Sequence, residues 1–376
     1  MPWREVATVD LRREFCCLVQ SESATISELC RRYGISRKTG YKWLGREQSQ
    51  GQDGLADRSR RPQHSPARTP VRLESQVLSL RQAHPAWGGR KIAARLRHLG
   101  HVAVPAPSTV TDILRRHGLL NPADHARPHW QRFEHANPND LWQIDFMGHF
   151  GTGQGNCHAL TMLDDHSRFN LLLQACARTD TDTVRPWLVQ TFERYGLPIA
   201  INTDNGAPWG SPAAPGALSE LTVWLVRLGI RCSHSRPYHP QTNGKEERFH
   251  RSLQAEVLNG RAFFTLDQVQ GDFTRWRQVY NHERPHQAIG LEVPGTRYRI
   301  SPRAYPASLP PINYGPDDQV RKAQANGLVS FRGRFLKVSN ALRGQPVAFR
   351  PRLNHDGSYD VFFCHHRLGE INLGSE

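Results

Sequence analysis

The chain has 376 residues and a formal net charge of +15, because 49 lysines and arginines outnumber 34 aspartates and glutamates. We expect no membrane span and no secretory signal, since no run of about 18 apolar residues occurs and the N-terminus lacks an apolar segment. Seven cysteines without a CxxC motif argue against a disulfide-rich scaffold and fit a reducing compartment. Excess positive charge favours a polyanionic partner, most often nucleic acid.

The positive charge is concentrated at the two ends of the chain. Residues 1–127 carry +11, residues 128–300 are neutral, and residues 301–376 carry +4. This asymmetry favours a division of labour between polyanion binding and chemistry. Polar, proline-bearing linkers then separate the expected domains. In chain order we expect a helix-turn-helix domain at 1–50, a basic linker at 51–75, a second helix-turn-helix or winged-helix-like domain at 76–120, a linker at 121–138, a central α/β core at 139–300, a proline-rich linker at 301–325 and a small β-barrel at 326–376.

The first segment predicts two helices joined by a tight turn. Thr25 and Glu28 have capping-box spacing, Gly34 ends the first helix, and Ser36 caps a basic second helix. This is the helix-turn-helix pattern, whose second helix enters the DNA major groove and contacts bases with its first residues. The candidate DNA contacts are Arg37, Lys38, Thr39, Tyr41 and Lys42. An ordinary small helical bundle is the alternative.

A second basic helical unit is expected between Val77 and Leu120. WGGRKIAARLRHLG has the pattern of an amphipathic basic helix, and Ser108 is a candidate N-cap for a helix that Gly118 ends. The stretch 102–104 between these helices is expected to be extended. The candidate DNA contacts of this unit are Arg90, Lys91, Ser108 and Thr109.

The central region predicts three strands followed by alternating helices and strands. In the first strand, Trp142, Ile144 and Phe146 alternate with Asp145, which therefore faces away from the large apolar side chains. The acids and histidine at 164–166 are interpreted as turn residues between the next two strands. Helices are expected at 181–196 and 218–228, with strands before Asp204 and at 230–233, and a last helix after 243. This order predicts a ribonuclease-H-like α/β layer.

Three acids in this region can converge on metal ions. Asp145 lies on the first strand, Asp204 ends a later strand, and Glu247 lies on the last helix. Carboxylate oxygens suit Mg²⁺ or Mn²⁺. Two such ions about 4 Å apart activate the attacking oxygen and stabilise the leaving oxygen of a phosphoryl displacement. We therefore predict a two-ion site held by these acids, although each acid alone is equally well explained as a capping or solvated residue.

Two adjacent glutamates compete for the third position. Asn243 and Glu246 have capping-box spacing, and Glu246 lies near an apolar stripe of the helix. Glu247 shares an edge with Arg251 and Gln254, as a DNA-facing catalytic edge requires. We assign Glu247 as the ligand and Arg251 as a DNA contact, and keep Glu246 as the alternative.

The C-terminal residues 326–373 show short alternating strands with glycine and asparagine turns, which predict a small β-barrel. Its exposed cations Arg332, Arg334 and Lys337 suit phosphate contacts, and a role in oligomerisation is the alternative. The run Cys364-His365-His366 lacks a partner pair, so we interpret it as unrelated to metal binding.

Four blocks of the sequence resemble a known family. WQIDFMG, NTDNGAPW, RPYHPQTNGKEERFHRSL and YNHERPHQAIG are similar to those of the bacterial insertion-sequence transposases with a retroviral-integrase-like Asp-Asp-Glu (DDE) core, and the similarity covers nearly the whole chain. The resemblance implies that Asp145, Asp204 and Glu247 are the metal-binding triad and that the C-terminal barrel is SH3-like. It also implies a structural or DNA-proximal role for YNHERPH. A loop beside the scissile phosphate would contribute the DNA contacts His239, Gln241, Asn243 and Lys245, with Gly244 among them.

The function that this resemblance implies is DNA transposition. The chain would bind the terminal inverted repeats of its element, cut them with Mg²⁺ to free a 3′-OH, and join that end to double-stranded target DNA. It would act as a homo-oligomer, a dimer or tetramer, in the bacterial cytoplasm and associated with the nucleoid. The alternatives are an inactive DNA-binding regulator and a ribonuclease-H-like nuclease without strand transfer. The 42 residues between Asp204 and Glu247 are more than in many members, and the stretch 211–217 is a candidate insertion.

Overall fold

The computed structural model describes residues 7–59, 68–120, 134–210, 218–234, 244–352 and 357–373. The chain divides into two compact units, Met1–Arg68 and Thr69–Glu376, which are described separately. Within the described ranges, no helix combines the length and the apolar character needed to cross a membrane.

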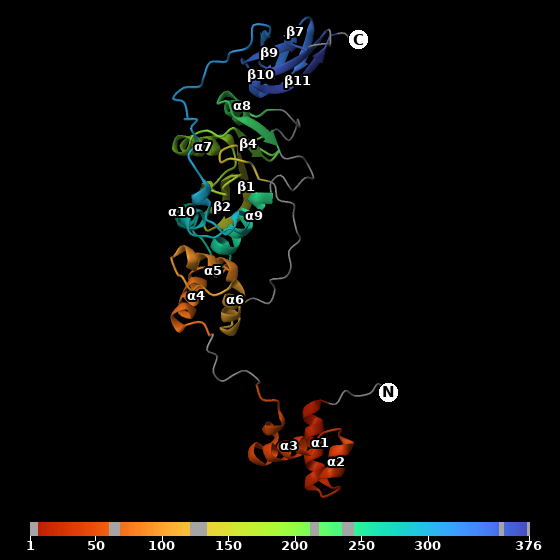
Figure 1. Cartoon of the computed structure of the whole chain (residues 1–376). Coiled ribbons are helices and arrows are strands. Elements are labelled where there is room, and N and C mark those ends of the chain that lie inside the picture. The colour runs from red at the N-terminus through yellow and green to blue at the C-terminus, as the bar shows by residue number, and fades with distance from the viewer. Residues whose placement is uncertain are drawn as a thin grey trace. The chain divides into compact units, whose positions relative to one another are not determined.

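The first unit is a small bundle of helices (Figure 1). Helices α1 (Thr8–Gln20), α2 (Ile26–Arg32) and α3 (Arg37–Gln50) precede a short 3₁₀ turn, η1 (Gly51–Leu55). Gly34 takes a φ of +64° after α2, and the Ser36 hydroxyl accepts the Thr39 N–H at 3.2 Å, so both predicted boundaries of the turn are confirmed. The Thr25 side chain makes no cap bond to the backbone and contacts the Glu28 carboxylate instead, so the predicted capping box is absent. Helix α1, which was not predicted, completes a core with Phe15 buried.

The second unit opens with three helices around Trp87. They are α4 (Val71–Ala83), α5 (Gly89–His98) and α6 (Pro107–Arg116), so α4 begins inside the predicted linker. Gly118 ends the last helix with a φ of +68°, as predicted. The prediction of Ser108 as N-cap is wrong: Ala106 holds that position and Pro107 begins the helix, because proline has no N–H that needs a capping partner. Residues 102–104 form no strand.

The centre of the second unit is a five-stranded mixed sheet with strand order β3-β2-β1-β4-β5. Strands β1 (Leu141–Thr152), β2 (Gly155–Asp164) and β3 (Asn170–Cys176) are antiparallel, and β4 (Ala200–Thr203) and β5 (Arg231–His234) run parallel to β1. Between and after these strands lie α7 (Thr181–Tyr195), α8 (Glu220–Arg227), α9 (Gly244–Leu253), a π-helical turn η3 (Gln254–Leu258), α10 (Leu266–His282), η4 (Gln287–Ile289) and α11 (Pro294–Arg297). The predicted order of strands and helices is confirmed, and it is that of the expected ribonuclease-H-like α/β layer.

The alternation in β1 sends side chains to two separate cores. Trp142 and Ile144 pack with α7 and α8 on one face, where Val184, Leu188 and Phe192 are buried. The other face packs against α9, η3 and α10, with Phe249 and Phe273 buried among others. The two helical layers on opposite faces are what the period-two pattern of β1 requires.

The C-terminal residues form a sheet domain at the far end of the second unit (Figure 1, blue). Its four-stranded sheet has the order β11-β10-β9-β6, from β6 (Gln319–Lys322), β9 (Pro346–Pro351), β10 (Ser358–Phe363) and β11 (His366–Asn372). Strands β7 (Leu328–Phe331) and β8 (Arg334–Lys337) pair only with each other among the described strands, and a turn η5 (Asn340–Leu342) follows. The described sheet is therefore open, and the predicted closed barrel is not confirmed. The domain packs on α8 through Val223 and Val226.

Candidate active site

The parallel pairing of β1 with β4 brings two of the predicted acids together. Gln143 pairs with Asn202, so two residues further Asp145 stands across from Asp204, the residue that follows β4. Both side chains are partly buried: Asp145 lies within β1, just beyond the residues that pair with β4, and Asp204 directly follows the carboxyl end of β4. In open α/β sheets, this edge is where ligands bind.

The charges of Asp204 and Glu247 act on Asp145. Burial, followed by the negative charge of Asp204, raises the pKa of Asp145 to about 7; a hydrogen bond from the Phe146 backbone opposes this rise, and the charge of Glu247 adds a smaller contribution to it. Burial also raises the pKa of Asp204, although the Gly206 N–H donates to its Oδ1 at 3.2 Å and the charge of His234 favours ionisation. Carboxylates that disfavour each other's charge form a site that a cation relieves.

Helix α9 presents its two adjacent glutamates in opposite ways. Glu246 is fully buried against β2, where its Oε2 lies 2.9 Å from the hydroxyl of Thr161, the residue paired with Asp145. His250 approaches the same hydroxyl with Nε2 at 2.8 Å. Glu247 is exposed, and its charge contributes to the raised pKa of Asp145, while the charge of Asp145 also acts on the buried Glu246. The arrangement favours Glu247 as the third acid, and this assignment stays a prediction.

The donor chemistry of these acids suits a hard divalent cation. Asp145, Asp204 and Glu247 offer only carboxylate oxygens, and burial, followed by the charge of Asp204, holds the pKa of Asp145 high. Among the described residues, however, no three His, Cys, Asp or Glu side chains are grouped closely enough to hold a metal ion. The predicted loop contacts His239, Gln241 and Asn243, and the candidate insertion 211–217, lie outside the described residues.

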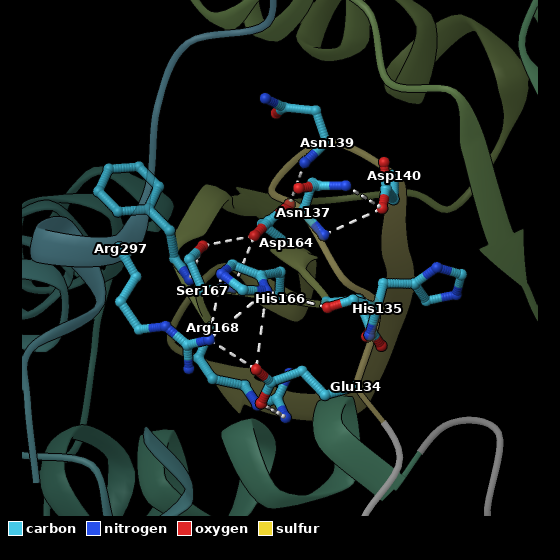
Figure 2. Close-up of polar contacts among 12 residues, drawn as sticks. Glu134, His135, Asn137, Asn139, Asp140, Asp164, His166, Ser167, Arg168 and Arg297 are labelled. Carbon is cyan, nitrogen blue, oxygen red and sulfur yellow. Dashed lines mark hydrogen bonds and ion pairs between the residues drawn. The ribbon is translucent and has the colours of Figure 1, made fainter. Parts of the chain in front are cut away.

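A network of hydrogen bonds and ion pairs anchors the segment before β1 to the turn between β2 and β3 (Figure 2). Glu134 accepts from Arg168 at 3.2 Å and from Arg297 at 2.6 Å. Asp164 is buried and accepts the backbone N–H groups of Asn139 and Ser167, each at 2.7 Å. The interpretation of this turn as mere turn residues is therefore too narrow, because its acids fix the entry to the strand that carries Asp145.

Asp165, in the same turn, holds the start of α9. Its buried carboxylate accepts the His135 N–H at 2.9 Å and the Gln143 amide at 3.0 Å, and it pairs with the ammonium of Lys245. Lys245 was predicted to contact DNA; the structure gives its cation an internal partner instead. This pair lies two residues from Glu247 and fixes the first turn of its helix.

We expect Asp165→Asn to lower the free energy of unfolding by about 3 kcal/mol, because breaking a buried ion pair leaves the other charge poorly compensated. Urea unfolding at neutral pH measures this loss. Asp182→Asn, at an exposed acid of α7, is the control and is expected to change stability by less than about 0.5 kcal/mol. Equal effects of the two substitutions would contradict the anchoring role.

The DNA contacts predicted on the first unit lie where a recognition helix presents them. Arg37, Lys38, Tyr41 and Lys42 are exposed along the first turns of α3, and Tyr41 is 59% exposed. Thr39 is half-buried, and its hydroxyl lies 2.9 Å from the hydroxyl of Ser36. Four of the five side chains are thus available to a partner.

The contacts predicted on the second unit divide into two groups. Arg90, Ser108 and Thr109 are exposed, as is Arg251 on the outer edge of α9. Lys91 instead lies 3.7 Å from the buried carboxylate of Glu256, so the prediction that it contacts DNA conflicts with its position inside the protein.

The YNHERPH block makes internal contacts. Tyr280 packs edge-on against Phe249, with ring centroids 4.8 Å apart, and the Asn281 side chain accepts the backbone N–H of Asn170 at 2.8 Å. Arg284 donates to Glu256 at 2.8 Å. Of the two roles implied for this block, these contacts favour the structural one. Sequence reasoning also missed Thr161 and His250, whose uncharged or lone polar side chains give no signal before the sheet is assembled.

Comparisons with known proteins agree with this architecture. Family models match residues 135–240 and 228–294 as "Integrase core domain", 39–114 as "Homeodomain-like domain", and 318–376 as "IS481 family transposase, C-terminal domain".

Similar proteins occur among bacterial insertion elements. An insertion element IS476 uncharacterized 39.2 kDa protein of Xanthomonas euvesicatoria is 26% identical over 276 residues, which are 71% of each chain. The transposase for insertion sequence element IS904 of Lactococcus lactis is 25% identical over 167 residues, 44% of this chain and 63% of that protein. Among solved structures, the HTLV-2 integrase catalytic core domain in complex with magnesium matches 44% of this chain and 99% of its own, at 17% identity and a TM-score of 0.32.

Proposed function

Because the chain belongs to the bacterial insertion-sequence transposases with an integrase-like core, we propose that it cuts and joins the ends of its own element. It would bind the terminal inverted repeats, hydrolyse a phosphodiester at each 3′ end, and transfer the freed 3′-OH into target DNA. The observation that carries this proposal is the parallel pairing of β1 with β4, whose register, continued by two residues, sets Asp145 across from Asp204, with Glu247 on the exposed side of α9.

Asp145, Asp204 and Glu247 would hold the divalent cations, Mg²⁺ or Mn²⁺, for which we propose two ions. Bound there, such ions supply activation of the attacking oxygen and stabilisation of the leaving oxygen. The protein's own contribution is to hold the acids in place. The Gly206 N–H orients Asp204, and the buried face of α9, with Glu246 and Phe249, keeps Glu247 on the exposed side.

DNA binding is proposed to divide between the helical domains and the core, with the domain boundaries as predicted from sequence. Helix α3 would read base edges, and Arg90, Ser108, Thr109 and Arg251 would contact DNA nearer the cut. The loop with His239, Gln241 and Asn243 would lie beside the scissile phosphate. A homo-oligomer would hold two ends together in the bacterial cytoplasm, at the nucleoid. Closure of the C-terminal sheet into an SH3-like barrel remains part of the proposal.

A footprint and cleavage map on the DNA that flanks the protein's own gene tests this function. We expect protection of repeated end sequences, Mg²⁺-dependent nicks at their 3′ ends, and joined products with a target duplex. Protection without nicks under any divalent cation would favour a DNA-binding regulator. Nicks that never yield joined products would favour a nuclease.

End binding should weaken steeply with salt, because lysine and arginine contacts to phosphate release counterions. If about six phosphates are contacted, affinity should fall roughly 10³-fold between 50 and 200 mM salt. Fluorescence anisotropy on an end duplex measures the slope. Arg37→Gln should reduce that slope by about one contact's share, whereas a response independent of salt would contradict the role of the basic domains.

A further inference from the structure

Glu256 is a buried carboxylate, outside the candidate active site, at which four nitrogen donors meet. Its side chain is 8% exposed. Oε1 receives the Arg284 Nε at 2.8 Å and lies 3.7 Å from the Lys91 ammonium. Oε2 lies 3.0 Å from the indole N–H of Trp276 and 3.5 Å from that of Trp87. An ionised carboxylate offers about four acceptor positions, so this set of donors uses its whole capacity.

The four donors come in equal number from two parts of the second unit. Trp87 and Lys91 belong to the second helical unit, the bundle α4–α6, while Trp276 belongs to α10 and Arg284 to the YNHERPH block at the end of that helix. A further ion pair, between Arg95 and Glu283 at 2.5 Å, joins the same two parts. Glu256 therefore connects the second helical unit to the core.

The segment that contains Glu256 is continuous with the helix that carries Glu247. Glu256 lies in η3, the π-helical turn that extends α9, and π-helical turns are frequent at functional sites. Arg284 also binds α9 itself, because its Nη2 donates to the Ser252 hydroxyl at 2.9 Å. A shift of the helical unit would thus act directly on the end of α9.

Charge makes Glu256 hard to replace. Burial alone would raise its pKa, but the charges of Arg284 and Lys91 bring the pKa below its ordinary value. Burial, followed by the nearby charge of Arg284, lowers the pKa of Lys91 to about 7. Without the carboxylate, two buried cations would face each other with no acid between them, which is the costly way to break a buried pair.

We propose that Glu256 is a positioning residue that couples the seating of the second helical unit on DNA to the placement of α9, and hence of Glu247. This inference rests on the proposed function, because it assumes that the helical unit binds the element's ends. It assigns no chemical step to Glu256. Cutting would then be favoured only when the ends are correctly held.

Hydrogen exchange with and without an end duplex tests the coupling in the full-length chain. In the natural protein, we expect DNA to slow amide exchange in α9 by about tenfold, within the usual range of coupling between sites. Glu256→Gln should still bind the duplex with similar affinity but lose this protection, and its cleavage rate should fall about tenfold with little change in KM. A merely structural role would weaken binding and cleavage together.

Asp272→Asn is the matched control, since Asp272 is also largely buried and also pairs with two cations, Arg261 and Arg275, but both of these belong to the core. It should keep the protection of α9. If Glu256→Gln fails to fold, Lys91→Met cuts the same link from the helical side and leaves the bond from Arg284, and it should lose the protection as well. Full protection of α9 in either variant, or none in the natural protein with DNA bound, would overturn the coupling. Failure of the natural protein to bind or cut end DNA would instead refute the proposed function.

Discussion

Asp145→Asn and Asp204→Asn should each reduce cutting and joining of end DNA by at least about 10²–10³-fold, the range seen when one preorganised electrostatic group is removed from an active site. The two side chains come from neighbouring strands, Asp145 from within β1 and Asp204 from just after β4, so neither can replace the other. Single-turnover cleavage of a labelled end duplex in Mg²⁺ measures the effect.

The same substitutions should leave the protein folded. Burial and the charges of its neighbours disfavour ionised Asp145, so a neutral asparagine removes repulsion, and the free energy of unfolding at pH 8 should be unchanged or higher. Asp182→Asn again serves as the control, with activity within about twofold of the natural protein. Retained cutting in Asp145→Asn would exclude the metal-site assignment, and lost activity accompanied by unfolding would leave stability as its cause.

The features that could be predicted from sequence are those set by the periodic pattern of apolar residues within a single strand or helix. Trp142 and Ile144 alternate with Asp145, so the face of each was readable before any partner strand was known. The burial of Glu246 beside an exposed Glu247 likewise follows from the helical period of Phe249 and Leu253. The order of the strands and helices, together with the positions of the three acids, then pointed to a ribonuclease-H-like layer.

The parts that could not be predicted depend on partners distant in the sequence. Lys91 and Lys245 are basic residues in basic stretches, and nothing local distinguishes a cation that pairs internally from one that faces DNA. Their partners, Glu256 and Asp165, lie 165 and 80 positions away, and they become neighbours only when the sheet and its helices are assembled. Closure of a barrel depends in the same way on pairing between its first and last strands, which alternation within each strand cannot specify.

Glu247→Gln should lower cutting and joining by about 10²–10³-fold, whereas Glu246→Gln should keep activity within about threefold. The reason is the environment of each side chain. Thr161 has one hydroxyl proton and lies within hydrogen-bond distance of Glu246, of His250 and of the Asp145 carbonyl, which can only accept. All three bonds form if Thr161 donates to Asp145 and accepts from a protonated Glu246 and from the Nε2–H of His250. A neutral amide can replace a neutral acid there.

The dependence of the free energy of unfolding on pH distinguishes Glu246 from Glu247 in a second way. Burial, followed by the charge of Asp145, raises the pKa of Glu246 well above its ordinary value. The stability that this group contributes is therefore present below its unfolded pKa and is lost as pH rises through its folded pKa. Asp145 acts in the same direction, and His250, whose pKa burial lowers to about 4, acts in the opposite one, while Tyr280 nearby has a pKa raised far above neutrality. Urea unfolding of the natural protein and of Glu246→Gln at pH 5 and pH 8 isolates Glu246 together with its coupling to Asp145, because the groups that are not coupled to Glu246 cancel in the difference. Between pH 5 and pH 8, Glu246→Gln should lose less stability than the natural protein. In the cleavage assay, an inactive Glu246→Gln and an active Glu247→Gln would reverse the assignment of the third acid.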